Sequence, residues 1–311
     1  MLTTSLINDL IEDQLTQWPE AAANFSNIRL VRRRNLILGD FHCAVQLNPA
    51  RIRSSAANVD ARSIAERPCF LCESNRPDCQ NTLSWVAGWQ LLVNPFPILP
   101  VHFTIVNPSH TPQADIPLEM AAMAEAAPDL VIFYNGARAG ASAPDHQHAQ
   151  AVLKSELPLI RLTEECHPAS RPGWMSSEDF RLDLPFSFLS AVITPDKTGM
   201  EALAKCRNAF GMDAVTGLPD TGLLNSFMWI DESGLLRIVI IPRRAHRPDC
   251  YFSEEPLKRI VSPGAIDMAG IIITPREEDF MALTDEDIRR IYAEVAFADG
   301  LPSEIKSRYK V

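Results

Sequence analysis

Residues 135–152 read NGARAGASAPDHQHAQAV, which places two of the chain's 7 histidines at one-residue spacing behind a loop of small residues. Successive side chains of a β-strand point to opposite faces, so a strand here puts His146, His148 and Gln150 on one side. Residues 136–143 carry almost no bulky side chain, so a ligand can approach their backbone closely. Exposed backbone N–H groups suit phosphate oxygens. The pattern therefore indicates a phosphate-binding loop that leads into a strand carrying histidines.

His148, in the middle of this group, is the candidate nucleophile. An imidazole has an unperturbed pKa of about 6.5, so one ring nitrogen is unprotonated near neutral pH. Its attack on the α-phosphorus of a nucleotide would give a nucleotidyl-histidine and divide one displacement into two. The Gln150 amide can donate to a phosphoryl oxygen but cannot protonate a leaving group. The site therefore suits leaving groups that are already acidic, such as a sugar phosphate or a nucleoside diphosphate.

The competing interpretation is that two histidines on a strand are ordinary polar surface, which is the commoner case for an isolated pair. The small-residue loop, Ser142 and Gln150 together favour the phosphate site. Arg138 is the strong charge within the loop, and it could add to the binding of an anion.

Length and composition limit the class of protein. The chain has 311 residues, of which 46% are hydrophobic and 22% charged, as is typical of a folded, water-soluble protein. A formal net charge of -10 argues against a protein that coats nucleic acid. No apolar run reaches the roughly 18 residues of a membrane span. Residues 1–18 lack the features of a signal peptide, and 7 cysteines without one predict a cytoplasmic location.

The hydrophobic pattern alternates between strand and helix periods, which predicts an α+β fold. The expected elements are an amphipathic helix over residues 1–18, a hairpin turning at Gly39 and Asp40, strands over 89–93 and 102–107, a helix near 118–127, strands over 129–136 and 146–153, a long crossover over 155–185, a hairpin turning at 232–234, a strand near 269–274 and a closing helix over 283–298 with Thr284 as its N-cap. A faint repeat relates residues 105–112 to residues 240–248, each a strand followed by proline, histidine and proline. The repeat favours two related halves.

The segment AGASAPDHQHAQ resembles the His-x-His-x-Gln branch of the histidine triad superfamily, which contains galactose-1-phosphate uridylyltransferases, diadenosine tetraphosphate phosphorylases and GDP-hexose phosphorylases. Asp145 departs from the family pattern, in which the proline equivalent to Pro144 is followed directly by the first histidine, equivalent to His146. The resemblance implies that His148 is the nucleophile and that Gln150 binds the transferred phosphoryl group. It also implies that Asn135 and Ser142 line the phosphate pocket, to which the loop residues Gly140 and Arg138 would belong.

The resemblance extends upstream. PCFLCESN is similar to the Cys-x-x-Cys of the uridylyltransferases, and NPSHTPQ to the segment with their third metal ligand. It implies a structural zinc bound by Cys69, Cys72, His110 and His146. Two thiolates and two imidazoles form a closed tetrahedral set, which is typical of structural zinc. A metal-free redox pair has the same cysteine spacing, and Cys79 is a possible substitute ligand.

These observations predict two fused histidine triad-like halves, each an antiparallel sheet with packed helices. Residues 1–155 would carry the catalytic strand and the zinc site, and residues 156–311 would lack the motif. The predicted function is that of a nucleotidyltransferase or phosphorylase that acts on a nucleotide sugar or dinucleoside polyphosphate and passes the nucleotidyl group to inorganic phosphate or a sugar phosphate. A homodimer is compatible with the resemblance. The alternatives are a non-catalytic protein that binds a nucleotide or phosphosugar, with the Asp145 insertion disabling attack, and a zinc-stabilised interaction domain.

Two further charged clusters lie outside this segment. The basic cluster Arg243, Arg244, His246 and Arg247 could receive a second phosphate or could be a solvated strand end. The run of arginines at 32–34 is interpreted as a solvated face.

Overall fold

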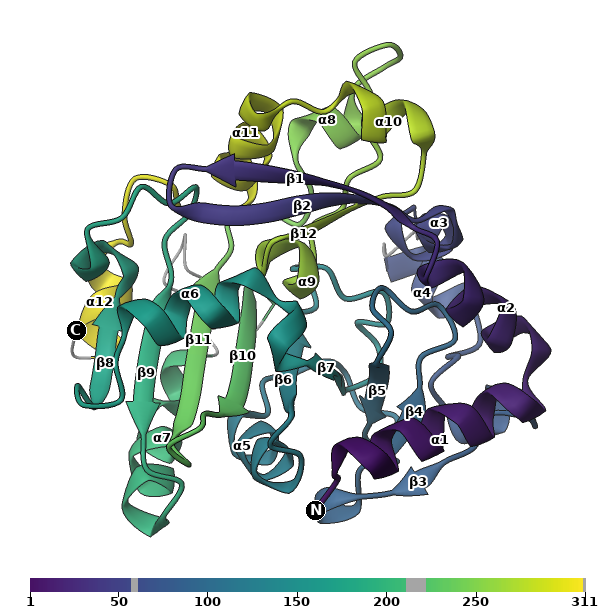
Figure 1. The fold of residues 1–311 in the computed structure, drawn as a ribbon, viewed down its shortest axis with the longest axis horizontal. Helices are drawn as coiled ribbons and strands as arrows, with labels where there is room; N and C mark the ends of the chain where they lie inside the picture. Colours follow the sequence, from purple (N-terminus) through teal and green to yellow (C-terminus); the bar gives the residue numbers. More distant parts are fainter. Residues whose placement is uncertain (57–60, 211–221, 310–311) are drawn as a thin grey trace.

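The computed structural model describes residues 1–56, 61–210 and 222–309 (Figure 1). Its centre is a nine-stranded sheet in which every neighbouring pair is antiparallel. The strand order is β3 (Leu83–Ser84), β4 (Gln90–Val93), β5 (His102–Val106), β7 (His148–Leu153), β6 (Leu130–Asn135), β10 (Leu224–Ile230), β11 (Leu236–Pro242), β9 (Leu189–Ile193) and β8 (Gly173–Ser176). A second sheet of three strands joins β1 (Arg32–Leu38), β2 (Phe41–Leu47) and β12 (Ile271–Thr274). The α+β class and the antiparallel pairing of the large sheet are confirmed, whereas in the small sheet β12 pairs with β2 in parallel.

Helices cover both faces of the large sheet. They are α1 (Thr4–Gln17), α2 (Pro19–Ile28), α3 (Ile52–Ser55), α4 (Ala61–Glu66), α5 (Pro117–Ala126), α6 (Pro158–Cys166), α7 (Lys197–Phe210), α8 (Asp249–Phe252), α9 (Ala265–Met268), α10 (Glu277–Ala282), α11 (Asp285–Val295) and α12 (Ser303–Tyr309). Short 3-10 helices span Pro49–Arg51, Glu73–Asn75, Val86–Gly88, Lys154–Glu156 and Ser177–Phe180. Residues of α1, α5 and α12 share one core with the sheet, and residues of α6, α9 and α11 share the other with the small sheet.

The large sheet has the same strand order on both sides of its middle. From the outside inward, the first half runs β4, β5, β7, β6, and the second half runs β8, β9, β11, β10. α5 connects β5 to β6, and α7 leads from β9 towards β10. The two halves join where β6 pairs with β10, with Phe133 opposite Phe227. This arrangement agrees with two related halves in one chain, while the division at residue 155 stays a prediction.

Several expectations need correction. The repeat between residues 105–112 and 240–248 does not align equivalent strands, because β5 corresponds to β9 in the mirrored order and β11 corresponds to β7. The crossover over 155–185 contains α6 and the edge strand β8, and α12 follows the helix that was expected to close the chain. Strand β7 begins at His148, so His146 lies in the turn before it. Both predicted hairpins and the Thr284 N-cap are confirmed.

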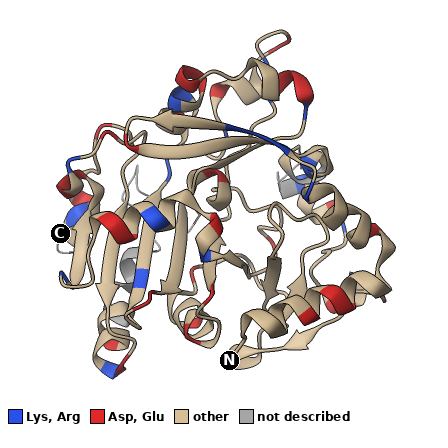
Figure 2. Cartoon of the chain, viewed as in Figure 1, with Lys and Arg blue, Asp and Glu red and all other residues tan. Residues whose placement is uncertain are grey.

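Figure 2 shows the charged residues along the chain, with the run of arginines coloured blue on β1. The run of arginines on β1 fastens the small sheet to its neighbours: Arg32 bonds with Glu277 of α10 at 2.5 Å, Arg33 donates to Gln46 and Arg34 donates to the carbonyl of Leu283. Arg32 and Arg33 are exposed, in agreement with a solvated face, whereas Arg34 is half-buried. Among the described residues, no helix combines the length and apolar character needed to cross a membrane.

Candidate active site

His148 is buried at the start of β7, with 4% of its surface exposed. Its Nδ1 lies 2.8 Å from the backbone oxygen of His146. A carbonyl oxygen only accepts hydrogen bonds, so Nδ1 carries the proton and Nε2 keeps its lone pair. Burial lowers the pKa of His148 to about 4, against a smaller upward effect of the His146 carbonyl. The imidazole is therefore neutral near pH 7, as a nitrogen nucleophile must be.

Gln113, which sequence reasoning missed, fixes the backbone of this strand. Its Oε1 accepts from the His148 N–H at 2.8 Å, and its Nε2 donates to the carbonyls of Asn135 and His148 at 2.8 and 2.9 Å. The ends of β6 and β7 are thus bridged by one buried amide, which holds both ends of the small-residue loop. A glutamine in an irregular segment 35 residues away carries no local signal of this role.

A cavity of about 680 Å³ adjoins His148. Its wall contains the side chains of Trp18, Phe70, Leu92, Phe96, Thr104 and Gln150. Ligand pockets typically measure about 300–1,000 Å³ and combine apolar walls with a few polar groups, so the cavity has room for a nucleoside. Phe70 and Leu71, which separate the two cysteines of the Cys-x-x-Cys segment, both line it.

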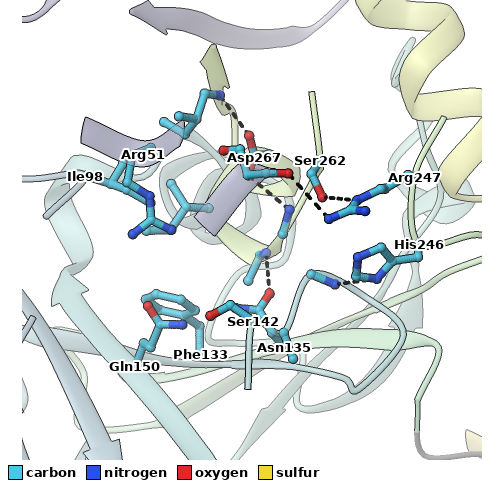
Figure 3. A pocket seen from close by; sticks show the side chains of 17 residues that line it. Arg51, Ile98, Phe133, Asn135, Ser142, Gln150, His246, Arg247, Ser262 and Asp267 are labelled. Carbon is cyan, nitrogen blue, oxygen red and sulfur yellow. Dashed lines mark hydrogen bonds between the residues drawn. The ribbon is translucent and has the colours of Figure 1, made fainter. Parts of the chain in front are cut away.

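A smaller cavity of about 50 Å³ lies beside the large one and shares Arg51, Ser142 and Gln150 with it (Figure 3). Its opposite wall comes from the second half of the chain, with Arg247 and Ser262 joined by a hydrogen bond of 2.9 Å. One water needs roughly 10–15 Å³ of such space, so the cavity holds about three to five water-sized groups, which suits a small tetrahedral oxyanion.

The charged residues that line the small cavity are Arg51, Arg247 and Asp267. Burial lowers the pKa of Arg51 to about 10, and the neighbouring Asp267 opposes that shift. Burial likewise raises the pKa of Asp267 to about 6, while backbone N–H groups of Ile273 and Gly264 favour its carboxylate. Both arginines stay charged at neutral pH, so the pocket has a net positive charge even with Asp267 ionised.

The predicted loop residues have different places. Asn135 is an anchor, because its Oδ1 accepts from the backbone N–H of Ala265 at 2.7 Å, and it also lines the small cavity. Gly140 has a φ of 97°, and a Cβ there would lie 2.4 Å from the Cα of Gly264. Only glycine fits this close approach between the loop and the second half. Ser142 lines both cavities, whereas the Arg138 side chain is exposed and is absent from both walls.

The extra residue Asp145 is accommodated without disturbing His148. Its carboxylate forms an ion pair with Arg67 at 2.9 Å, and Arg67 also donates to the carbonyl of Ser142 at 3.2 Å. The insertion thereby ties the loop to the segment that precedes Cys69. The geometry of His148 gives no support to the idea that the insertion disables attack.

The four predicted metal ligands lie together, although they are up to 77 residues apart in the sequence. Their ligand atoms all lie within 4.8 Å of one another, with Sγ of Cys69 and Nδ1 of His146 at 3.2 Å. Tetrahedral zinc with bonds of about 2.0–2.3 Å would place a sulfur and a nitrogen ligand roughly 3.5 Å apart. His146 Nε2 lies 2.7 Å from the carbonyl of Asn107, so Nδ1 faces the thiols unprotonated. The group fits a metal ion. Cys79 is not part of it.

The basic cluster over residues 243–247 divides between structure and site. Arg243 is fully buried and donates to Asn225 and to the carbonyls of Val295 and Pro263. Arg244 is exposed and lies over the ring of Phe297. The other two members, His246 and Arg247, line the small cavity.

The chain is similar to one protein family and to several solved structures. A family described as a domain of unknown function, DUF4922, matches residues 10–153. Yeast Ap4A phosphorylase Apa2 is 16% identical over 94% of this chain and 98% of its own, with a TM-score of 0.54. An ADP-glucose phosphorylase from Arabidopsis thaliana is 16% identical over 86% of this chain and 100% of its own, with a TM-score of 0.36. No curated protein sequence matches the chain.

The chain therefore shares the fold of yeast Ap4A phosphorylase Apa2, in agreement with the fold that the resemblance predicted. At 16% identity, the likeness to Apa2 is one of fold. The order of the strands, the buried histidine at the start of β7 and the two adjoining cavities are this chain's own evidence for a site.

Proposed function

We propose that the chain is a nucleotidyl-transferring enzyme of the phosphorylase type, which takes a nucleoside monophosphate from a nucleotide sugar or dinucleoside polyphosphate. The observation that carries the proposal is His148, a buried neutral imidazole held through Nδ1 beside a nucleoside-sized cavity. The yeast Ap4A phosphorylase, which shares the fold, has been crystallised with AMP and with Ap4A. A nucleotide substrate for this chain is consistent with both.

The reaction would occur in two displacements at phosphorus. In the first, the Nε2 lone pair of His148 forms a bond to the α-phosphorus, and the bond from phosphorus to the leaving oxygen breaks. The leaving group departs as an anion with the bonding electrons, and the Nδ1 proton stays on the ring against the His146 carbonyl. In the second, an acceptor oxygen attacks phosphorus and the N–P bond breaks. Gln150 would donate to a phosphoryl oxygen in both steps.

The size of the small cavity favours inorganic phosphate as the acceptor. Its space of about 50 Å³ suits a tetrahedral oxyanion, whereas a sugar phosphate is several times larger. Arg51 and Arg247 would neutralise the anion, with Ser262 and Ser142 as further hydrogen-bonding groups. Asn135 and Gly140 would shape this pocket. Arg138 lies outside its wall and would act only through its charge.

Zinc is the metal that the ligand set favours, and Cys69, Cys72, His110 and His146 would hold it. With four protein ligands the metal would have no open position, so its contribution would be structural. It would fix the side chain of His146, whose carbonyl holds His148. The cytoplasmic location and the homodimer remain predictions, the first resting on the cysteine content and the second on the resemblance.

Labelling with an α-phosphorus-labelled nucleotide tests the proposal. Nucleotide sugars and dinucleoside polyphosphates would each be mixed with the wild-type chain and with His148→Asn, and quenched in acid and in base. A phosphoramidate bond should survive base and be lost in acid, and the label should require His148. Nucleotide binding that is equal in both proteins, without label from any donor, would establish the non-catalytic binding protein instead.

A further inference from the structure

We propose that His102 is a positioning residue for Gln150: the main chain fixes its tautomer, and that tautomer turns the amide so that its NH2 group is left for the ligand. The inference rests on the proposed function, in which Gln150 binds the transferred phosphoryl group. His102 has no exposed surface, and its position at the start of an apolar strand gives no sequence signal of this role.

The backbone N–H of Ile98 starts the argument. It donates to Nδ1 of His102 at 3.2 Å, and a backbone N–H can only donate. Nδ1 is therefore unprotonated, and in a neutral imidazole the proton must sit on Nε2. This nitrogen lies 2.8 Å from Oε1 of Gln150. Since Nε2–H can only donate, the amide oxygen is the acceptor and its orientation follows from the main chain.

Protonation of His102 would break this arrangement, because a second ring proton on Nδ1 would face the Ile98 N–H. Two features oppose it: burial lowers the pKa of His102 to about 3, and the charge of Arg51 acts in the same direction. Ile98 is itself held in place, because Gln46 of β2 donates to its carbonyl at 3.0 Å. Hydrogen bonds therefore connect Gln46 of the small sheet to Gln150, through the backbone of Ile98 and the buried ring of His102.

The consequence concerns the kind of ligand. Gln150 lines both cavities, and with its oxygen turned towards the buried His102 ring the amide presents its NH2 group there. A free glutamine could present either end, so it would accept from a hydroxyl as readily as it would donate to a phosphate. The fixed amide therefore favours ligand groups that accept hydrogen bonds. Each non-bridging oxygen of a phosphoryl group is such an acceptor.

Two variants and a double-mutant cycle test the assignment. His102→Phe removes the donor, and it should slow the labelling of His148 by about 10- to 100-fold, as expected for a misplaced oxyanion donor, with nucleoside binding little changed. His102→Gln keeps one acceptor and one donor and should recover part of the rate. In a Gln150→Ala background, His102→Phe should cost little more, because the two side chains act as one unit. An equal loss in both backgrounds would overturn the proposal.

Nitrogen-15 NMR of the histidine-labelled full chain gives a readout that is independent of activity. His102 should show an unprotonated Nδ1 and a protonated Nε2 that do not change between pH 5 and pH 8. The opposite tautomer, or titration in this range, would refute the assignment even if both variants lose activity. If the wild-type protein takes up no label, the proposed function is wrong. The NMR measurement of the His102 tautomer would still show whether His102 orients the Gln150 amide.

Discussion

Replacement of Arg247 by alanine should separate the two displacements. Arg247 lines the small cavity and not the large one, and its Nε donates to Ser262 at 2.9 Å. If inorganic phosphate binds there, the variant loses about one charge-assisted hydrogen bond, which is worth roughly 1.5–3 kcal/mol. At about 1.4 kcal/mol per factor of ten, the phosphate concentration for half-maximal turnover should rise by roughly 10- to 150-fold. Labelling of His148 should change little.

Arg244→Ala is the matched control. It removes the same side chain from the same segment, but Arg244 is exposed over the ring of Phe297 and lines neither cavity. The assay is a rapid quench in two stages, in which His148 is first labelled and the label is then chased with increasing phosphate. Arg247→Ala should slow only the chase. If it slows both stages equally, or shifts the phosphate dependence no more than Arg244→Ala does, the small cavity is not the acceptor site.

Three other outcomes are expected. Burial holds the pKa of His246 at about 4, below the unfolded value near 6.5. The contribution of His246 to the free energy of unfolding is therefore present above pH 6.5 and is lost as the pH falls towards 4. In urea titrations, His246→Gln should remove about 2 kcal/mol of the decrease in stability between pH 7 and pH 5. Cys72→Ser should release bound metal on elemental analysis and slow labelling by about tenfold or more, because the His146 carbonyl loses its anchor. Gly140→Ala should cost more than about 2 kcal/mol, whereas Gly173→Ala, with a similar φ but open space around it, should cost about 1 kcal/mol.

Local patterns predicted those parts of the site that lie within a few residues of each other. The alternation around His148 and Gln150 placed both in the cavity wall, because a strand of period two leaves little choice. The same rule failed at His146, since the strand starts two residues later and His146 turns towards Cys69 and Cys72. The resemblance, and not the spacing alone, predicted that these three residues and the distant His110 form one group.

The remaining parts of the site depend on contacts that only the folded chain makes. Arg51 ends a short 3-10 helix after β2, whereas Ser262 lies in an irregular segment and Asp267 in α9, near the other end of the chain. They line one cavity because β12 pairs with β2. A sequence of isolated polar residues in loops does not show which of them will face the same cavity. The missed edge strand β8, with four residues beside several prolines, has too short a pattern to be distinguished from a loop.

In the part of the second half that the structure describes, the strand equivalent to β7 carries a different residue in place of His148. In the mirrored strand order β11 corresponds to β7. Gln150 pairs with Phe133 and Val239 pairs with Phe227, so Arg237, two residues before Val239, occupies the position that corresponds to His148. There it forms a buried ion pair with Asp231 at 2.6 Å and donates to the carbonyl of His167, so its charge is already neutralised. A tight hairpin joins β10 to β11, whereas β6 and β7 are separated by the small-residue loop. The described part of the second half therefore has a similar sheet with a tight hairpin where the first half has the small-residue loop, and it lines the small cavity through Arg247.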